Sequence, residues 1–325
     1  MRMLARRILF YAITALAAVT VDFMIPRVMP GNPVEALLSH MQGQVTVQNI
    51  HALEAQYGLN SSAGLWGQYT HYLANLAHGD LGLSTSSYPA TVTSVIRGAL
   101  PWTVGLIGMA TVISFVLGTL LGVLVAWRRG SWLDSLLPAT TFFQAAPYFF
   151  IAFLALDLFS TRLGWFPSGR AYGQLDFPGF NAAYAADVLD HAVLPALTIV
   201  LCSAAGWIVG MRNVMVTTMD EDYVLMAQAK GLPKGRVIWY AARNAILPSV
   251  AGFSLAIGFV VSGALLTEIV FSYPGLGFIL LQAVGARDYP LLQGIFLIIT
   301  FAVLLANLAA DSVYVFLDPR TRQEA

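Results

Sequence analysis

Histidine is the side chain best suited to hold a metal ion, and four of the five histidines lie between residues 30 and 101. They are His40, His51, His71 and His78. Zinc sites place their ligands at short fixed spacings, such as HExxH, so that two imidazoles share one helix face. No histidine here has such a partner, and His71 and His78 are seven residues apart. We therefore predict that the chain binds no metal.

Acidic residues inside apolar stretches are the second set that could do chemistry. Four lie within or at the edge of such a stretch: Asp22, Asp157, Glu268 and Asp311. A charge at the centre of a membrane costs about 2.5–3.5 kcal/mol on insertion scales, so an acid there is a candidate for function. Three of them, Asp22, Asp157 and Asp311, lie near enough to the end of their stretch to be structural or solvated instead.

Glu268 differs from the other acids because of the segment that follows it. Residues 271–277, Phe-Ser-Tyr-Pro-Gly-Leu-Gly, contain a proline and two glycines that should bend the chain near the outer surface. We predict either a structural role for this region or a place at an outer gate or substrate passage. The candidate gate residues are Glu268, Phe271, Tyr273 and Pro274.

Motifs of catalysis are missing from the sequence. There is no GxxxxGK[ST] loop to cradle phosphates, no GxSxG elbow and no CxxC pair. The single cysteine, Cys202, lies in an apolar run and excludes an internal disulfide. We infer that the chain is not an enzyme and that it binds no cofactor, ATP included.

Composition indicates the class of protein. Of the 325 residues, 58% are hydrophobic and 10% charged, whereas soluble domains are about 25% charged. This predicts an all-α protein that crosses a membrane several times. The formal net charge is zero and no basic and aromatic stripe is present, which argues against nucleic acid as a partner.

Six apolar stretches have the length of about 20 residues that crosses a bilayer core of about 30 Å. They lie near Ile8–Pro26, Trp102–Trp127, Leu136–Ser160, Val193–Met215, Val250–Phe271 and Leu291–Leu317. The arginines before the first stretch are typical of a signal peptide, but the later spans indicate a retained helix. If the N-terminus lies in the cytoplasm, 12 of the 17 basic residues are cytoplasmic. This asymmetry predicts that both termini lie in the cytoplasm. Pro147 should break the third span, because proline lacks a backbone donor.

The longest charged segment between apolar stretches is residues 220–248, DEDYVLMAQAKGLPKGRVIWYAARNAILP. Its three leading acids favour a helix N-terminus, and Gly231 followed by Leu232-Pro233 ends that helix and starts another. The sequence thus predicts a helix-glycine-helix hairpin. Tyr223, Ala227 and Gly231 recur at every fourth residue, so one face is small enough for another protein to approach closely. A solvated linker is the alternative.

A transporter without an ATP site draws its energy from an ion gradient or from a partner. Ion-coupled carriers often have internal repeats with interrupted helices at matching positions, and no repeat is visible between the halves of this sequence. We therefore favour a partner that docks on the hairpin. An ion-coupled carrier acting alone, and a membrane receptor or assembly scaffold, are the alternatives.

Short motifs run along nearly the whole chain. Those in the hairpin are Ala227-Gln228-Ala229-Lys230-Gly231-Leu232, Arg243-Asn244-Ala245 and Leu247-Pro248; the others are Pro30-Gly31-Asn32-Pro33, Tyr57-Gly58-Leu59, Gln68-Tyr69, Gly79-Asp80-Leu81-Gly82, Leu163-Gly164-Trp165, residues 191–197 (HAVLPAL), 271–277, 286–290 (ARDYP) and Leu317-Asp318-Pro319-Arg320. In this order they resemble the B-type membrane permeases of the peptide, oligopeptide and nickel group of ABC importers. The hairpin is similar to the family's EAA loop, which contacts the ATPase. Leu225 replaces the glutamate that gives this loop its name, and the stretch from Gly231 to Pro248 is a residue shorter than the family's.

The resemblance implies the type I ABC importer permease fold, in a prokaryotic cell membrane. We expect an N-terminal transmembrane helix in residues 1–29, an extracytoplasmic cap segment in 30–101 and a five-helix core in 102–325 with a coupling loop at 216–248. The ATPase-coupling residues would be Asp222, Tyr223, Ala227, Ala229, Lys230, Gly231 and Leu232.

Partners and cargo also follow from the resemblance. The implied partners are a second, C-type permease, two ATPase subunits that hold ATP and Mg, an extracytoplasmic solute-binding protein and membrane lipid. The substrate would be a peptide, an oligosaccharide or a nickel chelate. Three aromatic residues, Phe142, Phe149 and Trp207, either line the path or pack between helices.

Overall fold

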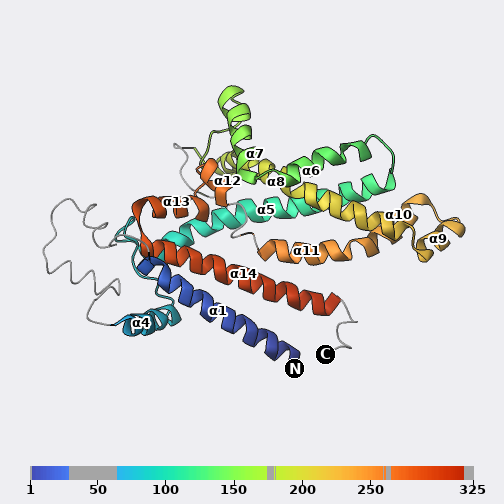
Figure 1. The fold of residues 1–325 in the computed structure, drawn as a ribbon. Coiled ribbons are helices and arrows are strands. Elements are labelled where there is room, and N and C mark those ends of the chain that lie inside the picture. Colours follow the sequence, from blue (N-terminus) through green and yellow to red (C-terminus); the bar gives the residue numbers. More distant parts are fainter. Residues whose placement is uncertain are drawn as a thin grey trace. The chain divides into compact units, whose positions relative to one another are not determined.

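The computed structural model describes residues 2–28, 64–173, 179, 181–258, 260 and 265–317, and every regular element in these ranges is a helix (Figure 1). The α-helices are α1 (Arg2–Val28), α4 (Leu65–Ala77), α5 (Val92–Trp127), α6 (Leu137–Ala145), α7 (Tyr148–Ala155), α8 (Ala182–Met219), α9 (Asp222–Ala229), α10 (Lys234–Ala245), α11 (Leu247–Gly258), α12 (Leu265–Val270), α13 (Leu276–Ala286) and α14 (Tyr289–Leu317). A 3-10 turn, η1 (Asp134–Leu136), precedes α6, and a π-helical segment, η2 (Leu156–Arg162), continues α7. The predicted all-α class is confirmed.

Four of these helices are long and apolar enough to cross a membrane. They are α1 over Arg6–Ile25, α5, α8, and α14 over Tyr289–Ala309. The helices α6 and α7–η2 are bent by 103° where they meet. If this pair counts as one broken span, it is the fifth. The predicted span Val250–Phe271 is found as two helices, α11 and α12, and residues 259 and 261–264 between them lie outside the described part. The prediction of a helical multi-pass protein is confirmed, while the count of six stays a prediction.

Pro147 breaks the third span as its chemistry predicts. Its ψ of 135° is extended, so α6 ends at Ala145 and α7 begins at Tyr148. The carbonyl of Pro147 accepts from the amide of Phe150 at 3.0 Å, which satisfies one backbone group at the break. Neighbouring protein or water must serve the rest at membrane depth.

The chain divides into two compact units: Met1–Thr103 with Pro274–Leu308, and Val104–Tyr273 with Ala309–Ala325. In the first unit, α4 is held to α1 by three side-chain pairs. Tyr72 donates to Asp22 Oδ2 at 3.0 Å, the hydroxyls of Thr20 and Tyr69 are 2.7 Å apart, and Arg27 Nη2 donates to Gln68 at 3.1 Å. Asp22 is buried. This fits the predicted structural role for Asp22 and does not fit a solvated side chain.

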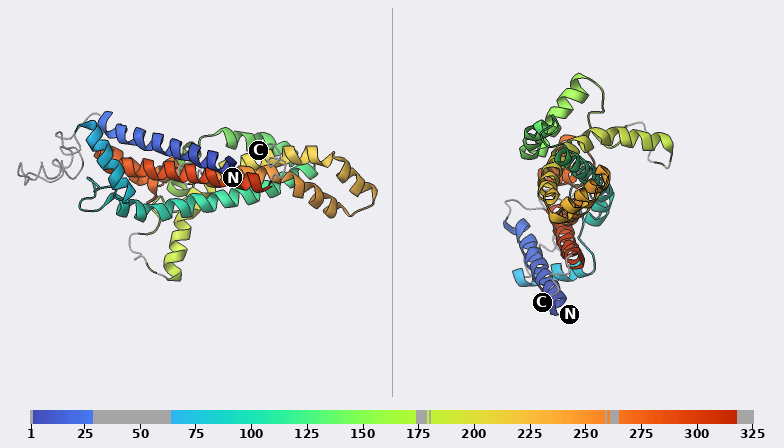
Figure 2. Two further views of the ribbon diagram at one scale, coloured as in Figure 1. Left: turned by 90° about the horizontal axis from the view of Figure 1, so that it is seen from below. Right: turned by 90° about the vertical axis from the view of Figure 1, so that its right-hand side faces the viewer.

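The second unit is built on the close approach of α5 and α8. Gly118 and Gly122 of α5 face α8 with the spacing that lets membrane helices come together. A Cβ on Gly118 would lie 2.5 Å from Trp207 Cβ, and one on Gly122 would lie 2.7 Å from Met211 Cβ. Only glycine fits at these two positions without moving a helix. Beyond the C-terminal end of α8 the chain continues into α9 and α10, drawn in gold and brown in Figure 2.

Candidate coupling hairpin and outer loop

The predicted helix-glycine-helix hairpin is confirmed as α9, Gly231 and α10. Gly231 has φ +73°, a left-handed conformation in which a side chain would be strained. The amide of Leu232 donates to Ala227 O at 3.2 Å and the amide of Gly231 donates to Gln228 O at 2.9 Å. These two bonds form a Schellman motif, which fixes the exit of α9. Pro233 then caps α10 with φ −59° and ψ 143°.

A small apolar core fixes the hairpin to the rest of its unit. Val224 of α9 and Val237, Ala241 and Ala245 of α10 are buried against Met211 and Met215 of α8 and Ala126 of α5. The buried residues of α10 recur every fourth position, which places them on one face. Through this core, α9 and α10 pack directly on α8.

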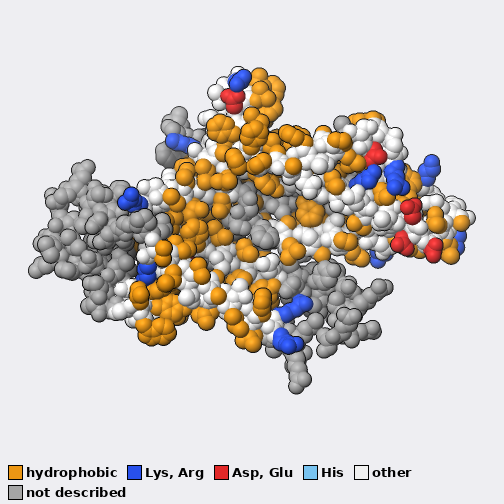
Figure 3. All heavy atoms as spheres, in the orientation of Figure 1, with side chains coloured by type: hydrophobic (Ala, Val, Ile, Leu, Met, Phe, Trp, Pro, Cys, Tyr) orange, Lys and Arg blue, Asp and Glu red, His pale blue; other side chains and the backbone are white. Residues whose placement is uncertain are grey.

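The exposed face of the hairpin is apolar at several positions. The exposed fractions are 41% for Tyr223, 48% for Leu225, 58% for Met226, 65% for Trp239 and 45% for Tyr240. In Figure 3, acidic and basic side chains gather at the end of the molecule where α9 and α10 lie. Exposed apolar residues of this size within a charged surface are typical of a protein contact.

The predicted coupling residues divide between the exposed face and the core. Asp222, Tyr223, Ala229, Lys230 and Gly231 are exposed, whereas Ala227 and Leu232 are partly buried and pack on the small core. The predicted coupling residues do not include four exposed apolar residues of the hairpin, Leu225, Met226, Trp239 and Tyr240. The signal was present in α10, where Trp239 and Tyr240 fall between the buried positions Val237 and Ala241.

An ion pair ties the loop after α5 to α8 near the hairpin. Arg212 Nη2 lies 3.1 Å from Asp134 Oδ1, and the amide of Gly130 donates to Asp134 Oδ2 at 3.3 Å. The bond from Gly130 is the largest influence that lowers the pKa of Asp134, and Arg212 acts in the same direction. The carboxylate form of Asp134 therefore stabilises this loop.

The candidate gate residues lie in α12 and in the buried loop that follows it. Glu268, Phe271 and Tyr273 are at most 2% exposed, and Pro274 is half-buried. The amide of Tyr273 donates to Glu268 O at 2.8 Å, and burial, then the charge of Glu268, raises the pKa of Tyr273 to about 12. The chain before α8 packs on this loop, since Arg170 N donates to Phe271 O at 2.9 Å. The structure thus brings these residues together, and their part in gating stays a prediction.

The remaining candidates are placed as follows. Asp157 lies 2.8 Å from Arg162 with both side chains exposed, which fits a solvated pair. The side chain of Asp311, with His40 and His51, lies outside the described residues. Among the residues that the structure describes, no group of three or more metal-ligating side chains occurs. Phe142 and Phe149 are exposed at 61% and 44%, whereas Trp207 lines a cavity described below.

The structure has several helices long and apolar enough to cross a membrane, and comparison with known proteins gives the family of the chain. Residues 118–323 match the binding-protein-dependent transport system inner membrane component family, to which the chain belongs. It is 35% identical over 309 residues to a putative peptide permease protein of Brucella suis, with 94% of each chain covered.

Two further relatives cover almost the whole chain. The di/tripeptide transport system permease protein DppB of Pseudomonas aeruginosa is 32% identical over 336 residues, covering 99% of this chain and 98% of its own. The oligopeptide transport system permease protein AppB of Bacillus subtilis is 30% identical over 317 residues, covering 97% of both. The protein is therefore a multi-pass inner-membrane permease subunit of an ABC importer, and the prediction of a transport subunit rather than an enzyme is confirmed.

Proposed function

We propose that this permease carries peptides into the cell. The observation that supports this best is the end-to-end similarity to relatives named for peptide, di/tripeptide and oligopeptide transport. Among the three expected cargoes, the peptide therefore has the support of these names, and the oligosaccharide and the nickel chelate become outcomes of the test.

The proposed complex pairs this chain with a second, C-type permease. Two ATPase subunits bind on the cytoplasmic side and hold ATP and Mg, since the sequence has no phosphate-cradling loop of its own. A solute-binding protein delivers the peptide from outside. The two permeases then enclose the path between them.

In this proposal the ATPase docks on the exposed face of α9 and α10. Tyr223, Leu225 and Met226 on α9 offer apolar contact, and Leu225 replaces a carboxylate that could have formed an ion pair. Lys230 is exposed, so a pair with an acid of the ATPase would contribute only about 0–1 kcal/mol. Apolar packing should therefore dominate the contact.

The rigid connection beneath this face gives the proposal its mechanism. Closure of the ATPases on binding ATP would move the hairpin as a unit, because its core is shared with Met211 and Met215 of α8. A rigid-body shift of α8 would then open the path to the other side of the membrane. No ion gradient enters this sequence of events.

Reconstitution in liposomes tests the proposed function. The permease is purified with the second permease and the ATPases from the same gene neighbourhood, and short alanine peptides, maltotriose and a nickel-histidine chelate are offered with the cognate binding protein. We expect ATP-dependent uptake of peptides that is indifferent to a proton or sodium gradient. Uptake of only the sugar or the chelate, or uptake without the ATPases, would overturn the proposal.

A further inference from the structure

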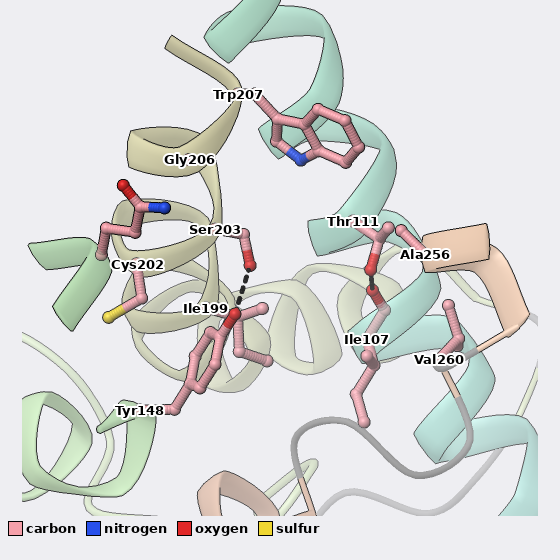
Figure 4. A pocket seen from close by; sticks show the side chains of 11 residues that line it. Ile107, Thr111, Tyr148, Ile199, Cys202, Ser203, Gly206, Trp207, Ala256 and Val260 are labelled. Atoms are coloured by element: carbon pink, nitrogen blue, oxygen red, sulfur yellow. Dashed lines mark hydrogen bonds between the residues drawn. The ribbon is translucent and has the colours of Figure 1, made fainter. Parts of the chain in front are cut away.

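A cavity of 470 Å³ lies within the second unit at the break of the third span (Figure 4). Its walls come from α5, α6, α7, α8 and α11, with Val260 closing one side. Thr111 lies near the middle of α5 and Ser203 near the middle of α8, so the cavity is midway along two spans. Its volume is within the range of about 300–1,000 Å³ that small-molecule sites have.

The lining combines polar groups without formal charge and apolar walls. The polar side chains are Thr111, Gln144, Tyr148, Ser203 and Trp207; the others are Ile107, Ile199, Cys202, Gly206, Ala256 and Val260. None of the described residues that line it is Asp, Glu, Lys, Arg or His. An ammonium or a carboxylate placed here would lose its hydration and find no counter-charge, whereas an amide or a hydroxyl would find partners.

The hydroxyls of Tyr148 and Ser203 point toward one another in the cavity, 3.1 Å apart (Figure 4). Tyr148 is the first residue of α7, so the break at Pro147 sets its position. The bond joins the broken span to α8. A ligand that offers one donor and one acceptor could replace it without leaving either hydroxyl unsatisfied.

Two polar residues of the lining are exposed at membrane depth. They are Gln144, which is exposed, and Tyr148, which is 36% exposed. An amide turned toward lipid tails would have no hydrogen-bonding partner, which is strongly unfavourable. This side of the unit therefore faces protein or water rather than hydrocarbon, as a wall of a passage must.

We propose that this cavity is a substrate station on the translocation path that takes the uncharged hydrogen-bonding groups of the cargo, its backbone amides and hydroxyls. The side-chain amide of Gln144 donates and accepts hydrogen bonds. The hydroxyls of Tyr148 and Ser203 give up the hydrogen bond between them and bind the cargo instead. The charged ends of a peptide lie outside this station. The inference rests on the proposed function, because it names the part of the cargo that the same path contacts.

Two glycines of α8 provide a matched pair of variants. A Cβ on Gly206 would lie 3.6 Å from Gln144 Nε2, inside the cavity, whereas one on Gly210 would meet no atom within 4 Å. We expect Gly206→Leu to lower peptide uptake about tenfold or more and Gly210→Leu to change it less than about twofold. Co-purification of the ATPases shows that both variants assemble. Normal uptake by an assembled Gly206→Leu complex would overturn the inference.

A thiol reporter tests the character of the cavity without any peptide. Cys202 is the only cysteine, so Cys202→Ala gives a background in which Ser203→Cys places one thiol in the cavity. Three methanethiosulfonates, hydroxyethyl (neutral), trimethylammonioethyl (cationic) and sulfonatoethyl (anionic), are compared, with each rate divided by that for free cysteine. The control is Gln228→Cys in the same background, since Gln228 is exposed on the hairpin.

At Ser203→Cys we expect the neutral reagent to react about tenfold faster than either charged reagent, because only the charged reagents need a counter-charge that the cavity lacks. At Gln228→Cys, compared in the two permeases before the ATPases are added, we expect the three rates to agree within about threefold, since water then surrounds that thiol. Equal rates at Ser203→Cys, or no reaction there, would overturn the inference. This result does not depend on peptide uptake, so failure of the proposed function, seen as a wild-type complex that imports no peptide, is recognised separately.

Discussion

Asp288 holds Ser86 by two hydrogen bonds at once. Its Oδ2 accepts from the Ser86 amide at 2.9 Å and from the Ser86 hydroxyl at 2.7 Å, and it also accepts from Ser84. Its Oδ1 accepts from the amide of Leu291 at 3.1 Å, so the same carboxylate caps the start of α14. Although Asp288 is fully buried, both its oxygens are therefore satisfied, and the start of α14 is joined to the turn before α5.

The first prediction follows from this buried carboxylate. Asp288→Ala should lower the stability of the permease by about 1–3 kcal/mol, because the Ser86 amide is left inside the protein without its partner. Thermal unfolding of the purified complex measures the change. Asp190→Ala is the control, since Asp190 is exposed on α8. Equal stability of both variants would show that the two joined segments do not need this bond.

The second prediction concerns the contact of α5 with α8. Gly118→Ala should cost about 1–3 kcal/mol, because the added Cβ would lie 2.8 Å from the backbone oxygen of Ala204 and the helices must part. Gly105→Ala in the same helix meets no atom within 4 Å and should change stability by less than about 0.5 kcal/mol. Thermal unfolding compares the two, and a smaller loss for Gly118→Ala than for Gly105→Ala contradicts the close packing.

Much of this architecture is predictable from local sequence, and the exceptions have a common cause. The break at Pro147 and the turn at Gly231 follow from backbone chemistry, which single residues determine. The direction in which Ala227 faces could not be predicted, because it depends on Met211 and Met215 of α8, far away in the sequence. The cavity could not be predicted either, because its walls come from five helices and no single one of their sequences indicates a cavity.

The third prediction is a pH dependence at the loop after α5. Because the pKa of Asp134 is lowered in the folded protein, its charged form contributes stability that is present above the ordinary value of 3.8 and is lost as the pH falls below it. Amide exchange at Gly130 should therefore be slow at pH 5 and should speed up as the pH falls toward 3, relative to the intrinsic rate. In Asp134→Asn this added acceleration should vanish, and its persistence would assign the effect to another group.

The fourth prediction tests the left-handed turn of the hairpin. Gly231→Ala should strain α9 by about 1–2 kcal/mol, because φ +73° brings a Cβ too close to the backbone. The expected result is weaker stimulation of ATP hydrolysis by the loaded binding protein, with the permease still present in the membrane. Gly235→Ala lies within α10, where a Cβ meets no atom within 4 Å, and should leave stimulation unchanged. Equal stimulation in both variants would remove Gly231 from the coupling residues.

The last prediction separates the docking face from the core beneath it. Met226 is 58% exposed, so Met226→Asp should leave thermal stability within about 0.5 kcal/mol of wild type while lowering co-purification of the ATPase, because a charge would replace an apolar contact. Ala227→Trp is the opposite case, since Ala227 packs on the buried cluster and a large ring there should disrupt the hairpin itself. Gln228→Ala, an exposed polar position on the same helix, serves as the control for any change to α9. If Met226→Asp keeps the ATPase bound and Gln228→Ala releases it, polar contacts rather than apolar packing hold the two proteins together.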